Sequence, residues 1–207
     1  MIKRVSPLLF LLGAASTGFA QTSYDAIDGY PGTVMPLSYY GIEADDTNLV
    51  NLHPVTSVDV QMADYLDTTL TNYDVTLHIY ATDPITGLPS TELQTITKSL
   101  TAIRNDTPLI TFTLASPWTP TSPHLFTAVT QSGGLGLGYG LTNTGPQIGT
   151  STADFAVYEG GEWLTTHFGN GPYNFMIRYN TLATPEPAPM LALGLGVLGL
   201  ITRRRKK

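Results

Sequence analysis

Two tryptophans are the side chains best suited to binding chemistry in this sequence. Trp118 stands two residues before Pro120 and Trp163 two residues after Gly161, so both are expected on turns. An exposed aromatic ring can stack on the apolar C–H face of a sugar, and nearby carboxylates such as Glu159 or Glu162 can accept hydrogen bonds from the sugar hydroxyls. Aromatic residues of β-rich proteins more often cover the core or a sheet edge. Trp118 and Trp163 are therefore candidates for sugar stacking, with core covering as the favoured interpretation.

Acidic side chains form two short clusters that have the oxygen chemistry of a calcium site. Ca²⁺ takes six to eight oxygen ligands, which carboxylates on neighbouring loops can supply. The EF-hand spacing is absent, and a solvated acidic edge is the favoured interpretation. We therefore expect no cofactor and no metal site, and Ca²⁺ binding remains the alternative. The clusters are Glu43, Asp45 and Asp46, and then Asp59, Asp64 and Asp67.

Residue patterns typical of catalysis are absent. The four histidines, His53, His78, His124 and His167, share no zinc-pair spacing, and no His-Glu-x-x-His motif occurs. There is no Gly-x-Ser-x-Gly nucleophile elbow. Glycines alternate over residues 133–140 without the spacing of a dinucleotide loop. This stretch is expected to be a flexible loop, or a strand whose bare face lets another backbone approach. We expect a protein that is not an enzyme.

The charge balance of the central region excludes one class of partner. The chain has 207 residues, of which 13% are charged, and no cysteine. Between residues 21 and 184, 15 acidic residues face only Lys98, Arg104 and Arg178, a net charge of −12. A surface of that sign repels phosphate backbones, so nucleic acid is not an expected partner. The missing cysteine excludes disulfides and thiolate metal sites.

Apolar residues at alternate positions predict β-strands in the middle of the chain, because successive side chains of a strand point to opposite faces. The polar residues between them are expected to face water. Turn signals separate the runs and indicate eight to ten strands. Residues 90–104 also fit a helical spacing, but the surrounding β context favours a strand. The alternating positions are Val58, Val60 and Met62; Val75, Leu77 and Ile79; Ile110, Phe112 and Leu114; Phe155 and Val157; and Phe175, Ile177 and Tyr179.

These runs predict an all-β fold for residues 21–183. Two antiparallel sheets that bury their apolar faces against each other, a two-sheet sandwich, suit this number of strands and need no disulfides. A jelly-roll connection is expected. The order of elements is similar to jelly-roll ectodomains that precede anchoring tails, in which a strand with an aromatic end, here His78-Ile79-Tyr80, leads into an Asp-Pro/Gly-Leu-Pro turn.

Residues 1–20 have the features of a secretory signal peptide. Lys3 and Arg4 precede an apolar run over residues 5–15, and small residues stand at Gly18 and Ala20. This pattern predicts export and cleavage after Ala20. The alternative is a buried helix at the start of a cytosolic domain. It is disfavoured because nothing caps such a helix.

Residues 184–207 combine a proline-rich linker, an apolar run and a basic tail. Residues 188–201 would extend about 21 Å as a helix, less than the ~30 Å hydrocarbon core. Length alone favours a buried helix. The run is apolar all round, however, and the long side chains that follow it can snorkel to the interface. We predict a transmembrane helix at about 188–202. The cytoplasmic tail that follows contains Arg203, Arg204, Arg205, Lys206 and Lys207.

The order of these C-terminal elements resembles the PEP-CTERM sorting signal. Pro185, Glu186 and Pro187 stand directly before the apolar run, and Arg203-Arg204-Arg205 follows it. The resemblance implies an exported protein of a bacterium that makes extracellular polysaccharide. It also implies processing near the tripeptide by exosortase, a membrane-embedded, transpeptidase-like enzyme. Glu186 and its flanking prolines then serve recognition and not catalysis. The alternative is an unprocessed proline-rich tail with a hydrophobic anchor.

The expected function follows from the two ends of the chain. We expect a protein exported through the inner membrane to the cell surface, outer envelope or extracellular matrix, with a structural or adhesive role. Before processing, the C-terminal helix would hold it in the membrane. Exosortase is the expected partner and exopolysaccharide a candidate partner. A polysaccharide-binding module is the alternative function, and a secreted glycoside hydrolase is a less favoured one.

Overall fold

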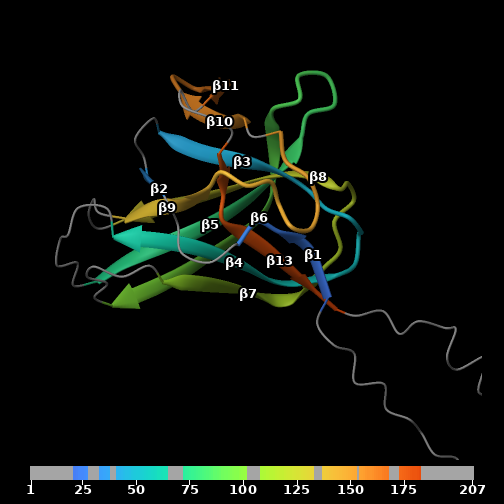
Figure 1. Cartoon of the computed structure of the whole chain (residues 1–207), viewed down its shortest axis with the longest axis horizontal. Helices are drawn as coiled ribbons and strands as arrows, with labels where there is room; N and C mark the ends of the chain where they lie inside the picture. The colour runs from blue at the N-terminus through green and yellow to red at the C-terminus, as the bar shows by residue number, and fades with distance from the viewer. Residues whose placement is uncertain are drawn as a thin grey trace, which may run out of the picture. The chain divides into compact units, whose positions relative to one another are not determined.

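Antiparallel strands in two sheets make up the described part of the chain (Figure 1). The computed structural model describes residues 21–27, 33–37, 41–64, 72–101, 108–132, 137–152, 154–167 and 173–182. All of them belong to one compact unit, Ala20–Ala183. The predicted all-β, two-sheet fold is therefore confirmed. The jelly-roll connection stays a prediction, and the expected signal peptide and C-terminal helix lie outside the described residues.

The seven-stranded sheet contains the strands from both ends of the unit. Its main path is β1 (Gln21–Asp25), β13 (Ile177–Thr181), β4 (Val55–Asp64), β9 (Leu137–Thr142) and β12 (Asn174–Phe175); β2 (Thr33–Pro36) also pairs with β9, and β7 (Leu109–Trp118) with β4. The six-stranded sheet has the order β11 (Glu162–His167), β10 (Asp154–Glu159), β3 (Ile42–Asn48), β8 (His124–Ser132), β5 (Asn72–Thr82) and β6 (Pro89–Thr101).

The alternating runs become the strands that the sequence predicted. The stretch over residues 90–104 is also confirmed as mainly strand, since β6 extends to Thr101. β7 keeps the expected alternation best: Ile110, Phe112 and Leu114 are buried, and the residues between them are exposed. The described residues contain 13 strands, more than the eight to ten expected; the alternating run over Phe175, Ile177 and Tyr179, for example, is divided between β12 and β13.

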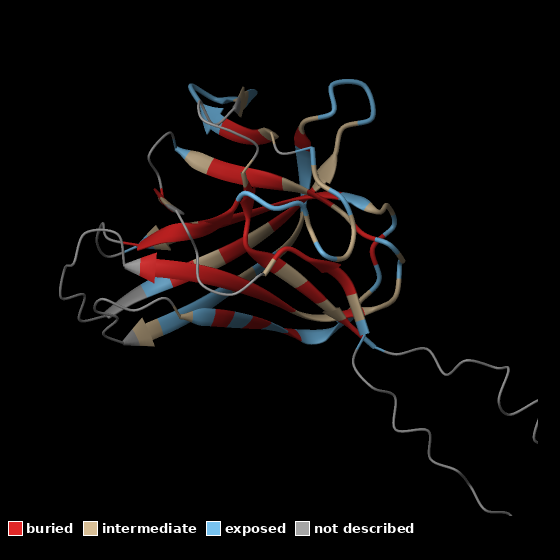
Figure 2. Cartoon of the chain, in the orientation of Figure 1, coloured by how far each residue is buried: buried red, intermediate tan, exposed pale blue. Residues whose placement is uncertain are grey.

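Strands of both sheets contain buried residues (Figure 2), and the main core consists of apolar and aromatic side chains. Tyr139 of β9 stacks on Phe175 of β12 with ring centroids 3.9 Å apart, and Phe155 of β10 lies 6.0 Å from Phe175. Tyr24 and Tyr179 meet edge to face at 6.4 Å. All five rings are at most 2% exposed, so they contribute strongly to the free energy of folding through burial.

Polar bonds cross this core and join the two sheets. The Tyr139 hydroxyl of β9 accepts a hydrogen bond from the Val129 N–H of β8, and it lies 3.1 Å from the Glu43 carbonyl oxygen of β3. Tyr179 of β13 bonds through its hydroxyl to Thr127 Oγ1 of β8. The sandwich is therefore held by directional contacts as well as by apolar packing.

The prediction that polar residues of β4 face water is wrong. Asp59 and Gln61 are both only 7% exposed. β4 lies between β13 and β7, and their side chains cover the outer face: Thr111 Oγ1 donates to Asp59 Oδ1 at 2.7 Å, and Asn180 Nδ2 donates to Asp59 Oδ2 at 2.8 Å. A central strand with bonded neighbours on both sides can bury its polar face because those neighbours satisfy it.

Glycine permits one close backbone approach, as the alternation over residues 133–140 suggested. Gly138 lies in β9 opposite Pro36 of β2. A Cβ at this position would stand 2.5 Å from the Met35 carbonyl oxygen. The strand interpretation is confirmed for residues 137–140, whereas residues 133–136 lie outside the described part.

The first and last strands of the unit are neighbours. Gln21 of β1 stands opposite Thr181 of β13, and Arg178 Nε donates to Asp25 Oδ2 at 2.9 Å across the same pair. β13 is bonded on its other side to β4, so the last strand is an interior strand of its sheet.

Candidate functional site

The hairpin of β10 and β11 places Trp163 on the outer face of the six-stranded sheet. Gly160 and Gly161 form its two-residue turn with φ of 63° and 94°, values that glycine adopts at little cost. The turn pairs Tyr158 with Trp163 and Ala156 with Thr165. Since Phe155 and Val157 belong to the main core, Ala156 and Tyr158 point to the opposite, outer face.

A row of alanines runs across this outer face. Ala156 of β10 is in register with Ala44 of β3, which is in register with Ala128 of β8. The three alanines form a second apolar cluster with Tyr80 and Phe126, and Trp163 packs against it. Small side chains leave room here for large rings from neighbouring rows.

The outer rings make a contiguous aromatic group, which we call the aromatic platform: Tyr80, Tyr158 and Trp163. The Trp163 ring lies 5.2 Å from the rings of both Tyr80 and Tyr158, at interplanar angles of 69° and 57°. Tyr80 comes from β5, three strands beyond β10 in the sheet order. Trp163 is half-buried and Tyr158 is 40% exposed, so the platform is anchored on one side and open on the other.

A histidine and a glutamate border the platform on β5 and β6. His78 stacks on Tyr80 with ring centroids 6.1 Å apart. Its Nδ1 lies 2.5 Å from Glu92 Oε1, and its Nε2 lies 2.9 Å from Thr130 Oγ1. Burial by itself would raise the pKa of Glu92. Hydrogen bonds from His78 and Thr95, together with the charge of His78, outweigh burial and lower this pKa. Burial, with the charge of Glu92 next, raises the pKa of Tyr80 to about 12.

Beside the platform the surface is hollowed between the β10–β11 hairpin and the loop that joins β5 to β6. In Figure 1 both rise from the same side of the molecule. Two adjoining hollows of about 180 and 240 Å³ share Gly87, Phe126 and Thr152. The first is also lined by Leu88, Asp154, Phe155, Ala156 and Thr165, and the second by Asp46, Thr47, Thr82, His124 and Leu125.

The wall formed by the β5–β6 loop is ordered by an aspartate. Asp83 Oδ1 accepts hydrogen bonds from the N–H groups of Ile85 at 2.8 Å and Thr86 at 2.9 Å. These bonds, that of Thr86 first, lower the pKa of Asp83. The loop thus has a defined conformation at neutral pH.

The first acidic cluster is not a solvated edge. Glu43 and Asp45 are 0% exposed and point into the core, and Asp45 Oδ2 accepts a hydrogen bond from the Phe175 N–H at 2.9 Å. Burial, with the charge of Asp46 next, raises the pKa of Asp45 well above its ordinary range. Asp46 points the other way and accepts from Ser151 Oγ at 2.8 Å. Strand alternation therefore divides these carboxylates between two faces.

The second acidic cluster is only partly described. Asp59 lies on the outer face of the seven-stranded sheet, where the side chains of Thr111 and Asn180 bond to it and cover it. Asp67 lies outside the described residues. Within the described ranges, no three side chains of the His, Asp and Glu types gather closely enough to hold a metal ion.

The two tryptophans lie on different sheets and on strands, not on turns. Trp118 ends β7 opposite Val55 of β4 and packs against the main core. It thus has the core-covering place that the sequence favoured, whereas Trp163 lies on the outer platform. Tyr80 and Tyr158 were missed as candidates. The signal for Tyr158 was its place one residue after inward Val157.

The C-terminal site residues, Pro185, Glu186, Pro187, Arg203, Arg204 and Arg205, lie outside the described part of the chain, and so does the expected span at 188–202. Within the residues that are described, no helix has the length and apolarity needed to cross a bilayer.

The described residues define an all-β protein of the two-sheet antiparallel class. Residues 183–206 match the PEP-CTERM protein-sorting motif, so the chain carries this motif at its C-terminal end. The motif is that of an exported, surface-directed protein and implies recognition by exosortase. Comparison with the curated proteins and with the solved structures found no match.

Proposed function

We propose that this chain is an exosortase substrate whose β-sandwich has a structural or adhesive role at the cell surface, in the outer envelope or in the extracellular matrix. The motif over residues 183–206 carries the proposal. Within it, the prolines at positions 185 and 187 favour an extended backbone, which would offer an enzyme an accessible segment next to an apolar run. The signal-peptide pattern of residues 1–20 supports export by an independent feature.

Mass spectrometry of the protein isolated from its own host tests the sorting step. We expect a C-terminus near residues 185–187 in the processed form. Substitution of Glu186 by Ala should leave the precursor intact in the membrane fraction. The matched control is Pro189→Ala, which removes a proline outside the tripeptide and should be processed as before. A wild-type protein that retains Lys207 throughout would refute processing.

A structural or adhesive role fits the missing catalytic motifs. The sequence has neither a His-Glu-x-x-His motif nor a Gly-x-Ser-x-Gly nucleophile elbow, so we propose a role without catalysis. Fractionation of the host should find the processed protein in the envelope or matrix. Deletion of residues 21–183 with both ends retained should abolish the contribution of this protein to adhesion of the host cells, and it should leave sorting unchanged. An unchanged phenotype would contradict the role.

Polysaccharide binding is the second candidate function, and one observation favours it. The rings of Trp163 and Tyr158 lie together on the outer face, where Tyr158 is 40% exposed. Rings in such a position are suited to stack on sugars. Trp118 packs against the main core and does not share this surface. Of the two tryptophans, only Trp163 therefore supports polysaccharide binding.

A further inference from the structure

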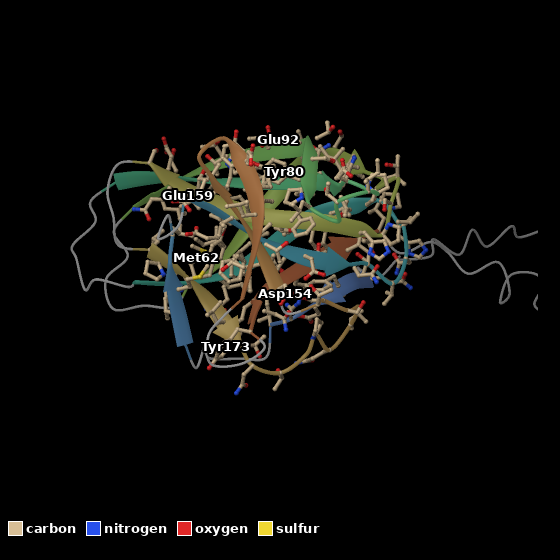
Figure 3. The ribbon with its side chains drawn as sticks, turned by 90° about the horizontal axis from the view of Figure 1, so that it is seen from above. Met62, Tyr80, Glu92, Asp154, Glu159 and Tyr173 are labelled. Carbon is tan, nitrogen blue, oxygen red and sulfur yellow. The ribbon has the colours of Figure 1, made fainter. Side chains whose placement is uncertain are left out.

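The aromatic platform and the hollows beside it are continuous along the strands. Thr165 and Ala156 line the first hollow, and each lies two residues from a platform ring, Trp163 and Tyr158 respectively. Two residues along a strand correspond to about 7 Å. A ligand stacked on the platform therefore reaches the hollow without leaving the surface. Figure 3 looks from above and labels Tyr80, Asp154 and Glu159 around the β10–β11 hairpin.

The platform is fixed before any ligand arrives. Trp163 packs between Tyr80 and Tyr158 at 5.2 Å from each, and Tyr80 is only 9% exposed. His78, which stacks on Tyr80, is itself bonded to Glu92 and Thr130. A ring held in place in this way loses little rotamer entropy on binding.

The hollows supply the polar partners that sugar hydroxyls need. Asp154, Thr152 and Thr165 line the first hollow, and Asp46 and His124 line the second. Volumes of about 180 and 240 Å³ are below the ~300–1,000 Å³ of enclosed small-molecule pockets. We call the two adjoining hollows together the groove. An open groove of this size suits one segment of a longer chain that continues on both sides, and it does not suit a small ligand that the protein must enclose.

The charges around the groove select the kind of chain. Asp46 and Asp154 line it, and Glu92 borders the adjoining platform through its bond to His78, which stacks on Tyr80. Of the described lysine and arginine residues, Lys98 donates to the Thr111 carbonyl oxygen of β7, and Arg178 pairs with Asp25 in the seven-stranded sheet; neither lines the groove. A polyanionic glycan would meet like charge here, whereas an uncharged one would not.

We infer that the outer face of the six-stranded sheet binds a neutral polysaccharide chain, with Trp163 and Tyr158 stacking on one sugar and the adjoining groove receiving the next. The inference deepens the second candidate function and rests on it. It does not depend on the sorting step, whose own readout is the C-terminus of the protein in its host.

Fluorescence tests this inference because the chain has only two tryptophans. The full-length protein is kept in a zwitterionic detergent, so that no sugar headgroup competes. Trp118→Phe leaves Trp163 as the only reporter. We expect neutral cello-, malto- or manno-hexaose to change its emission saturably, and oligogalacturonate at equal concentration to leave it unchanged. Trp163→Phe, which reports from Trp118, should show no such change.

Two further variants separate binding from folding. Thr165→Tyr fills the groove at an exposed strand position and should weaken binding about tenfold or more, with the platform intact. Thr113→Tyr is the matched control on β7, an exposed threonine of the other sheet, and should bind as the parent does. Both should keep the parent circular dichroism spectrum.

The inference is overturned if none of the neutral hexaoses changes Trp163 emission, if oligogalacturonate binds instead, or if Thr113→Tyr weakens binding as much as Thr165→Tyr. Lost binding with normal C-terminal processing would count against this site alone. An unprocessed wild-type protein would count against the proposed sorting and leave the binding result standing.

Discussion

Removal of the Tyr139 hydroxyl tests whether the polar bonds across the core stabilise the sandwich. In Tyr139→Phe the ring keeps its stacking on Phe175 at 3.9 Å, so little apolar contact is lost. The hydroxyl otherwise accepts from the buried Val129 N–H and lies 2.9 Å from the Val129 carbonyl oxygen and 3.1 Å from that of Glu43. An orphaned buried donor costs about 1–3 kcal/mol. At about 2–4 °C per kcal/mol, the melting temperature should fall by about 2–12 °C.

Urea and thermal unfolding of residues 21–183, followed by circular dichroism and tryptophan emission, measure this effect. The fragment is first compared with the full chain by circular dichroism. Tyr158→Phe is the matched control, because this hydroxyl belongs to a side chain that is 40% exposed, and its midpoint should stay within error of the parent. If Tyr139→Phe unfolds at the parent midpoint, the bonds that join the sheets contribute nothing measurable.

Three further outcomes follow from buried or crowded positions. Because burial raises the Asp45 pKa, the native state holds its proton more tightly than the unfolded chain does, so stability falls as pH rises above about 4. Asp45→Asn should then raise the urea midpoint at pH 7 and not at pH 4; an equal gain at both values would contradict this. Gly138→Ala should lower the free energy of unfolding in urea by about 1–3 kcal/mol, because the added Cβ would stand 2.5 Å from the Met35 carbonyl oxygen. Gly145→Ala is the control and should be neutral, because its added Cβ would have nothing within 4 Å. Millimolar Ca²⁺ should leave the thermal midpoint unchanged, because Glu43 and Asp45 point into the core; a rise of several degrees would restore a calcium site.

Sequence periodicity predicted the strands well where one face is buried and the other wet. β7 is such a strand, with Ile110, Phe112 and Leu114 inward. It failed at β4, where hydrogen bonds from neighbouring strands allow Asp59 to be buried. Period-2 patterns describe one strand, and they carry no information about what its partners contribute to the second face.

β3 shows a stronger failure of the same kind. The hydrophobicity rule would turn Ala44 inward and its acidic neighbours outward, but the structure does the reverse. Ala44 joins the outer alanine row, and Asp45 finds the Phe175 N–H in the opposite sheet. Ala128, which lies beside Ala44, and Phe175, which bonds to Asp45, are each more than 80 residues away along the chain. No local sequence pattern could therefore indicate this arrangement.

The candidate site was half predictable for a related reason. Trp163 stood out as a residue type, and its hairpin was visible in Gly160-Gly161. That Tyr80 lies beside it depends on the strand order between β10 and β5. Trp118, chosen on the same grounds, lies against the core of the sandwich. The C-terminal motif needed no such long-range information, because contiguous residues define it.

The place of β13 has a mechanical consequence. It is the last described strand before residues 183–206, and it is clamped between β1 and β4. Because β13 pairs along both sides, its release would break two rows of backbone hydrogen bonds, whereas release of an edge strand would break one. A sandwich tethered by its C-terminal end could thus bear tension without unravelling from that end.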